Sequence, residues 1–202
     1  MKTHRLVCVL AMVSLVSGCY VQSLHVFYSD ETRTAVPGIV GEWESKIQLG
    51  KELTEKNITP WTFTEDRIET YDTENRYGEL EVVYFKVDGT LFVDFTAGEP
   101  FRDAEFNTSV YWGAGITRVH SLCKVEQKEE QLTLTPLNIQ WFSDRIEKDM
   151  LDLPYVKPVG PDRNFVFTAT PEQWQQFLDE HKDDRDVFNP KYRFVFRKKN
   201  VE

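Results

Sequence analysis

Hydrophobic and polar residues alternate along much of the chain after residue 38, with the period of two that is typical of half-buried β-strands. Trp43, Ser45, Ile47 and Leu49, for example, are separated by charged or amide side chains. The same pattern predicts strands in residues 59–65, 67–72, 80–87, 90–96, 116–125, 131–137 and 191–199. A mostly β fold follows from this patterning.

One hairpin can be predicted with its register. Asp88-Gly89 separates two of these segments, and Asp-Gly is a preferred two-residue hairpin turn. The turn places Tyr84 opposite Val93, and side chains two residues apart share a face. Six apolar side chains then form the expected core face, whereas the opposite face is mixed and either solvated or half covered: Leu80, Val82, Tyr84, Leu91, Val93 and Phe95.

Two segments have helical periodicity instead. Asn138 can cap a helix in residues 139–151, and Thr170-Pro171 offers an N-cap and a first-turn proline for a helix in residues 171–181. We therefore expect one domain in residues 38–202, mostly β with two short helices.

The first 18 residues have the pattern of a signal peptide. Lys2 and Arg5 precede an uncharged, mostly apolar run over residues 6–16, which is too short to span a bilayer as a helix. Small residues then precede Cys19, which predicts cleavage between Gly18 and Cys19. An ordinary cleaved signal, in which Cys19 is incidental, is the alternative.

Val16-Ser17-Gly18-Cys19 resembles the bacterial lipobox. The resemblance implies a lipoprotein whose Cys19 carries diacylglycerol and fatty acids such as palmitate, so the bilayer is its expected partner. In such proteins an aspartate after the cysteine favours the inner membrane. Tyr20 occupies this position, so we expect an outer-membrane protein whose domain faces the periplasm. Residues 19–37 are expected to be the lipidated N-terminus and an extended arm that packs on the domain.

Charge and cysteine content exclude several classes. The leader carries two basic residues and no acid, so residues 19–202 hold 22 basic against 33 acidic residues, a formal net charge of −11. Such a surface repels phosphate, which argues against nucleic acid. Once the leader is removed and Cys19 is acylated, Cys123 is the remaining cysteine, so no intramolecular disulfide is expected.

Gly41-Glu42-Trp43 resembles the Gly-x-Trp motif of lipocalins, which are barrels that hold one small apolar ligand. The family places an Arg across this Trp, and Arg193 or Arg197 could take that role. The whole layout is similar to a group of uncharacterised bacterial lipoproteins through "FYSDE", "GEWES", "GTLFVDF", "VHSLCKV", "QLTLTPL" and "FVFTATPEQWQQFL". This second resemblance implies an antiparallel, lipocalin-like barrel or a barrel-like sheet, and no known activity.

Few residues suggest chemistry. His25, His120 and His181 lie far apart in sequence and form no metal-binding motif, and no cofactor motif is present. No catalytic residue is assigned. Arg118 and His120 share one face of a predicted strand, and together with Trp43 they are our candidates for lining a ligand site.

These observations favour a non-enzymatic envelope lipoprotein that binds a small apolar ligand or an envelope partner through its barrel. An alternative is an interaction module whose barrel is filled by its own side chains. The third hypothesis is an envelope hydrolase. It requires an Asp or Glu within hydrogen-bond reach of His120 in a cleft.

Overall fold

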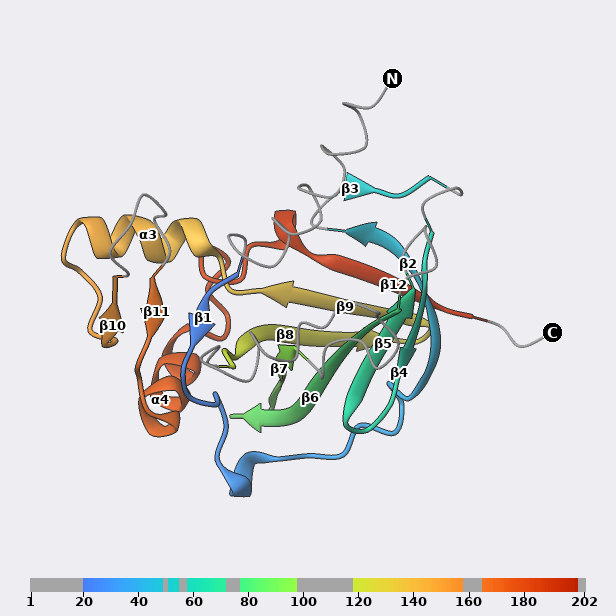
Figure 1. Cartoon of the computed structure of the whole chain (residues 1–202), viewed down its shortest axis with the longest axis horizontal. Helices are drawn as coiled ribbons and strands as arrows, with labels where there is room; N and C mark the ends of the chain where they lie inside the picture. The colour runs from blue at the N-terminus through green and yellow to red at the C-terminus, as the bar shows by residue number, and fades with distance from the viewer. Residues whose placement is uncertain are drawn as a thin grey trace, which may run out of the picture.

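The computed structural model (Figure 1) describes residues 20–48, 51–54, 58–71, 77–97, 118–157 and 165–199. The predicted signal peptide, the cleavage position at Gly18 and the lipidation site Cys19 lie outside the described residues. No helix within the described ranges is long and apolar enough to cross a membrane.

Eight antiparallel strands form a closed barrel, as the alternation predicts. Each strand pairs with the next along the chain, and the last pairs with the first to close the ring. A short strand, β3 (Lys51–Glu52), extends the ring beside β2. The barrel strands are β2 (Gly41–Gln48), β4 (Pro60–Phe63), β5 (Arg67–Tyr71), β6 (Tyr77–Val87), β7 (Thr90–Ala97), β8 (Ser121–Lys128), β9 (Gln131–Pro136) and β12 (Phe194–Lys198).

The hairpin between β6 and β7 has the predicted register. Tyr84 pairs with Val93 and Val82 with Phe95. Asp88 and Gly89 both have positive φ, 43° and 79°, as the two central residues of a type I′ turn require. The face predicted to be the core therefore points into the barrel.

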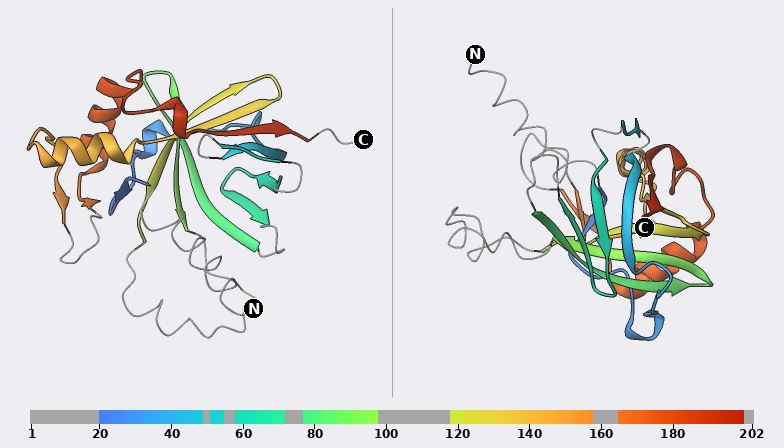
Figure 2. Two further views of the ribbon diagram at one scale, coloured as in Figure 1. Left: turned by 90° about the horizontal axis from the view of Figure 1, so that it is seen from above. Right: turned by 90° about the vertical axis from the view of Figure 1, so that its right-hand side faces the viewer.

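Two helices and a small sheet cover one side of the barrel (Figure 2). The helices are α3 (Ile139–Glu147) and α4 (Pro171–His181), and the sheet contains β1 (Gln22–Ser23), β10 (Tyr155–Val156) and β11 (Val166–Phe167). Two short 3-10 helices, η1 (Asp30–Thr32) and η3 (Pro190–Tyr192), complete the described elements.

The helix ends follow from local chemistry. At α4, the Thr170 side chain accepts from the Gln173 N–H and the Gln173 side chain accepts from the Thr170 N–H, which forms a capping box. Helix α3 ends at Glu147, before the expected residue 151. Asp149 adopts a left-handed φ of 55°, and the Met150 N–H bonds the Arg145 carbonyl, so the chain turns away in a Schellman-type cap.

The barrel wall separates two hydrophobic cores. The interior core lies inside the barrel and includes Trp43, Phe63, Tyr84, Val93, Leu132 and Phe196. The outer core lies between the barrel wall and the helices and includes Val21, Phe27, Phe85, Phe142, Phe167 and Trp174. The mixed face of β6 and β7 is thus half covered, because Phe85 and Phe92 lie beneath the outer layer.

Trp43 of the Gly-x-Trp motif is fully buried inside the barrel. Its Nε1 donates to the Ile39 carbonyl at 2.8 Å, and the Lys198 ammonium lies 5.7 Å from its ring centroid. We expected Arg193 or Arg197 in this position. On β12, Phe194 and Phe196 point inward, so the neighbouring Arg197 points outward and the cation over the ring is Lys198.

Candidate functional site

The structure separates the three residues proposed to line a ligand site. Trp43 lies in the interior core. His120 bonds Asp94, which sits between inward-facing Val93 and Phe95 and therefore points outward. Arg118 bonds Glu81, which points outward by the same alternation on β6. Arg118 and His120 thus lie outside the barrel and do not share a cavity with Trp43.

A cleft of about 290 Å³ opens on this outer wall, and we call it the outer cleft. It is formed by the arm, the turn before β5, and the outward faces of β6, β7 and the chain before β8. It is mixed in character, with three carboxylates, one guanidinium and one imidazole. Its lining residues are Tyr28, Asp66, Arg67, Glu81, Val82, Val83, Asp94, Thr96 and His120.

The most specific feature of the outer cleft is a histidine–carboxylate pair. His120 Nδ1 lies 2.8 Å from Asp94 Oδ1, and Asp94 is only 3% exposed. In the tautomer whose proton is on Nδ1, His120 donates this bond to Asp94 and keeps a lone pair on Nε2. No described residue hydrogen-bonds Nε2. The acid that a hydrolase would require within reach of His120 in a cleft is therefore present.

The same two residues also hold the arm against the barrel. Asp94 Oδ2 accepts from the Phe27 N–H at 3.0 Å. The backbones of His120 and Ser23 exchange two hydrogen bonds of 2.9 and 2.8 Å, and the Ser23 hydroxyl accepts from Trp174 Nε1. A buried carboxylate that accepts from both a side chain and a backbone N–H is well satisfied. The pair therefore has a structural role.

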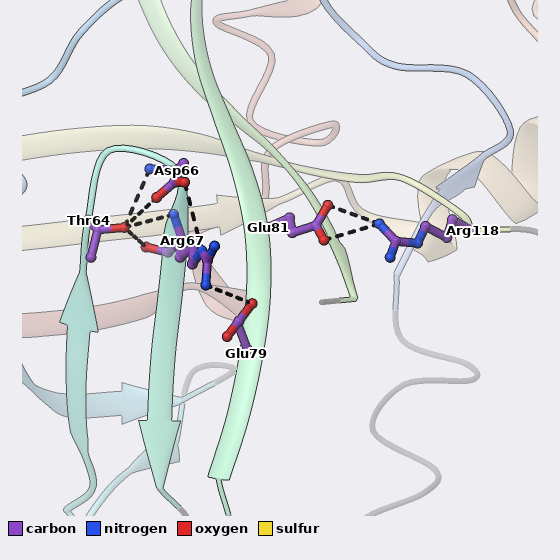
Figure 3. A network of polar contacts seen from close by, with 6 residues as sticks. All are labelled: Thr64, Asp66, Arg67, Glu79, Glu81 and Arg118. Carbon is purple, nitrogen blue, oxygen red and sulfur yellow. Dashed lines mark hydrogen bonds and ion pairs between the residues drawn. The ribbon is translucent and has the colours of Figure 1, made fainter. Parts of the chain in front are cut away.

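Ion pairs surround the cleft (Figure 3). Arg118 Nη1 contacts both carboxylate oxygens of Glu81, at 3.0 and 3.1 Å. Arg67 lies 3.6 Å from Glu79 and 3.7 Å from Asp66, which are looser contacts. All these side chains except Glu79 are more than a third exposed, so the pairs contribute little to stability. Their importance lies in presenting both signs of charge beside one cleft.

Two polar groups of the interior core have perturbed acidity. Burial raises the pKa of the Tyr84 hydroxyl well above 10.0, and this oxygen has no hydrogen-bond partner among the described residues. Burial also raises the pKa of the Cys123 thiol above its usual range, so this thiol stays protonated at neutral pH. Cys123 is 2% exposed and acts as a small core residue, not as a nucleophile.

The sequence identified His120 but missed its partner. Asp94 is 26 residues away in the chain, and its position within an apolar strand was the available signal. An acid between Val93 and Phe95 must point away from the core face, but alternation cannot show what it meets there. Tyr28 and Glu81 reach the same cleft from the arm and β6 and were also not identified.

The described residues contain no group of three or more His, Cys, Asp or Glu side chains that could hold a metal ion. Comparison of the chain with protein-family models, with curated proteins and with solved structures gives no match. The lipobox-like segment and the outer cleft are therefore the two features from which a function can be inferred.

Proposed function

We propose that this chain is a non-enzymatic, lipid-anchored protein of the bacterial outer membrane, with its barrel in the periplasm. Its barrel acts as a filled scaffold, and its binding site is the outer cleft. The charged leader, the short apolar run and the cysteine after small residues support the anchor.

The observation that carries the filled-barrel proposal is a group of aromatic rings inside the barrel. Neighbouring rings in this group have centroids 5.3–6.5 Å apart, as in edge-to-face and offset contacts. An apolar ligand inside the barrel would have to share the interior with them. The group consists of Trp43, Trp61, Phe63, Phe194 and Phe196.

The outer cleft suits a small molecule that carries hydroxyl or amino groups. Asp66 and Glu81 accept hydrogen bonds, as does His120 Nε2 in the tautomer whose proton is on Nδ1, while Arg67 donates. The volume of about 290 Å³ is near the lower limit for ligand pockets, which favours a unit the size of a sugar. The excess of carboxylates favours a cation over an anion.

Binding can be tested with three sugars that differ in charge: glucosamine, N-acetylglucosamine and glucuronate. We expect saturable NMR shifts at the cleft that weaken in this order. Glu81→Gln should weaken glucosamine binding, whereas Glu130→Gln, which changes an exposed acid in the β8–β9 turn, should not. Absence of saturable binding for all three would contradict the proposed ligand class. Saturable binding of a fatty-acid probe would contradict the filled barrel.

The anchor is tested separately. Intact-mass spectrometry of the natively purified full chain should reveal acyl mass that is lost in Cys19→Ala. An unacylated Cys19 would contradict the proposed membrane anchor and leave a secreted domain.

The Asp94–His120 pair favours a second candidate, a hydrolase in which His120 Nε2 takes a proton from an attacking water. No Ser or Cys lines the cleft among the described residues, and the Thr96 hydroxyl donates to the Val119 carbonyl, so the water itself would be the nucleophile. General-base catalysis would make ester hydrolysis fall by about 10²–10⁴-fold in His120→Ala. If the parent chain and His120→Ala both hydrolyse the ester at the uncatalysed background rate, the non-enzymatic proposal is supported.

A further inference from the structure

The residues directly after Cys19 already pack on the folded domain. The ring of Tyr20 packs edge to face on Phe95, with centroids 5.8 Å apart. The next residue, Val21, is 2% exposed and belongs to the outer core. Consecutive Cα atoms are about 3.8 Å apart. Cys19 is thus covalently held within about 3.8 Å of a residue that packs on the barrel.

Hydrogen bonds fix the segment that follows. Gln22 and Ser23 pair in parallel with β11, and the Leu24 N–H donates to the Phe167 carbonyl at 2.9 Å. Ser23 is fully buried and bonded to both His120 and Trp174. A Gly/Ser-rich tether would let a domain move freely above its anchor. This segment is part of the fold from its first residue.

The packing of Tyr20 also identifies one end of the barrel. Phe95 lies two residues before the end of β7 at Ala97, and it pairs with Ser121, the first residue of β8. The hairpin turn at Asp88-Gly89 and the β8–β9 turn at Glu129-Glu130 lie at the other end of these strands. The 11 residues of β6 span about 33 Å along the strand, and the usual strand tilt of about 40° makes the two ends about 25 Å apart along the barrel axis.

We propose that the barrel end bearing Tyr20, Phe95 and Ala97 rests on the bilayer surface, with the opposite end pointing into the periplasm. This inference rests on the acylation of Cys19 proposed above. Acyl chains buried in the bilayer hold Cys19 at the headgroups. Because Tyr20 follows Cys19 directly and packs on Phe95, the folded body must lie there too, with this end nearest to the headgroups. His120 is adjacent to Ser121, so the outer cleft opens close to the membrane surface.

Orientation is measurable with the full-length acylated chain in phosphatidylethanolamine–phosphatidylglycerol vesicles. Single donor fluorophores are attached to Ala97→Cys at the near end and to Glu130→Cys at the far end, both exposed positions. Cys123 is buried and leaves the labels unambiguous. With an acceptor on the lipid headgroups, we expect energy transfer to be about twofold or more higher from residue 97, because the labels are about 25 Å apart along the barrel axis.

The matched control inserts about 12 Gly/Ser residues between Cys19 and Tyr20, which gives a reach of about 20 Å and should remove the difference between the labels. Equal transfer from both labels in the uninterrupted chain would overturn the orientation while leaving the anchor intact. Intact mass is read first on the same samples. Lack of acyl chains there would overturn the anchor and, with it, the membrane contact.

Discussion

The two cores on either side of the barrel wall are built differently. The interior core is formed by alternate residues of successive strands, and its neighbours are set by sheet register. The outer core brings together segments that are far apart in the chain: Phe27 of the arm, Phe142 of α3, Phe167 of β11 and Trp174 of α4. In the outer core Trp174 Nε1 donates to Ser23, whereas the Tyr84 hydroxyl in the interior core has no hydrogen-bond partner in the part of the chain that the structure describes. Strand pairing thus organises the interior, and the arm completes the exterior.

The largest effect is expected when a fully buried tryptophan is removed from either core. Trp174→Ala and Trp43→Ala should each lower the free energy of unfolding by about 3–5 kcal/mol, because both leave a large cavity. Denaturant titration measures this loss. The two variants should differ in the arm: Trp174 bonds Ser23 and packs on Phe27, so its loss should loosen the arm and let trypsin cleave faster after the exposed Arg33.

Trp43→Ala is the control for that difference, since Trp43 contacts Phe63 and Ile39 inside the barrel. Under native conditions, faster cleavage after Arg33 should appear only in Trp174→Ala. Similar cleavage in both variants would show that the two cores unfold as one unit, contrary to the comparison.

A smaller effect is expected at the contact between the arm and the barrel. Asp94→Ala should cost about 1–3 kcal/mol in unfolding free energy, because the Phe27 N–H loses its acceptor in a buried place. Cleavage after Arg33 should also increase. Asp94→Asn keeps an oxygen that can accept from Phe27, so it should lose less stability. If Asp94→Asn and Asp94→Ala lowered the free energy of unfolding equally, the contribution of Asp94 to stability would come from its contact with His120 and not from its bond to the arm.

The two cores also differ in how far the sequence predicts them. Alternation and the Asp88-Gly89 turn were enough to predict the hairpin, its register and the inward face of Tyr84 and Val93. Helix α4 was predicted from its capping residues because those signals are local. The Asp94–His120 pair and the outer cleft were not predictable, since strand order and the path of the arm decide which outward residues meet.

The smallest effect at neutral pH concerns Tyr84. Its hydroxyl loses its bonds to water on folding and gains none from the described residues, so Tyr84→Phe should leave stability unchanged or raise it by up to about 1 kcal/mol. Tyr192 is exposed, so Tyr192→Phe is the control and should have the same free energy of unfolding as the parent chain. A loss above about 1 kcal/mol would mean that the hydroxyl has a buried partner, such as a water or a ligand inside the barrel.

The same substitution has a larger effect at high pH. Burial raises the pKa of Tyr84 above its ordinary value of 10.0, so above pH 10 this side chain ionises in the unfolded chain and stays protonated in the native one. The unfolded state then binds fewer protons, and stability falls as pH rises. At pH 11 the ionisation of Tyr84 in the unfolded chain should lower the free energy of unfolding of the parent by about 1.4 kcal/mol. Tyr84→Phe should not show this loss. Urea unfolding at pH 9 and 11 measures the difference. Parallel alkaline losses in parent and variant would mean that Tyr84 ionises in the native barrel, so that its interior is open to water.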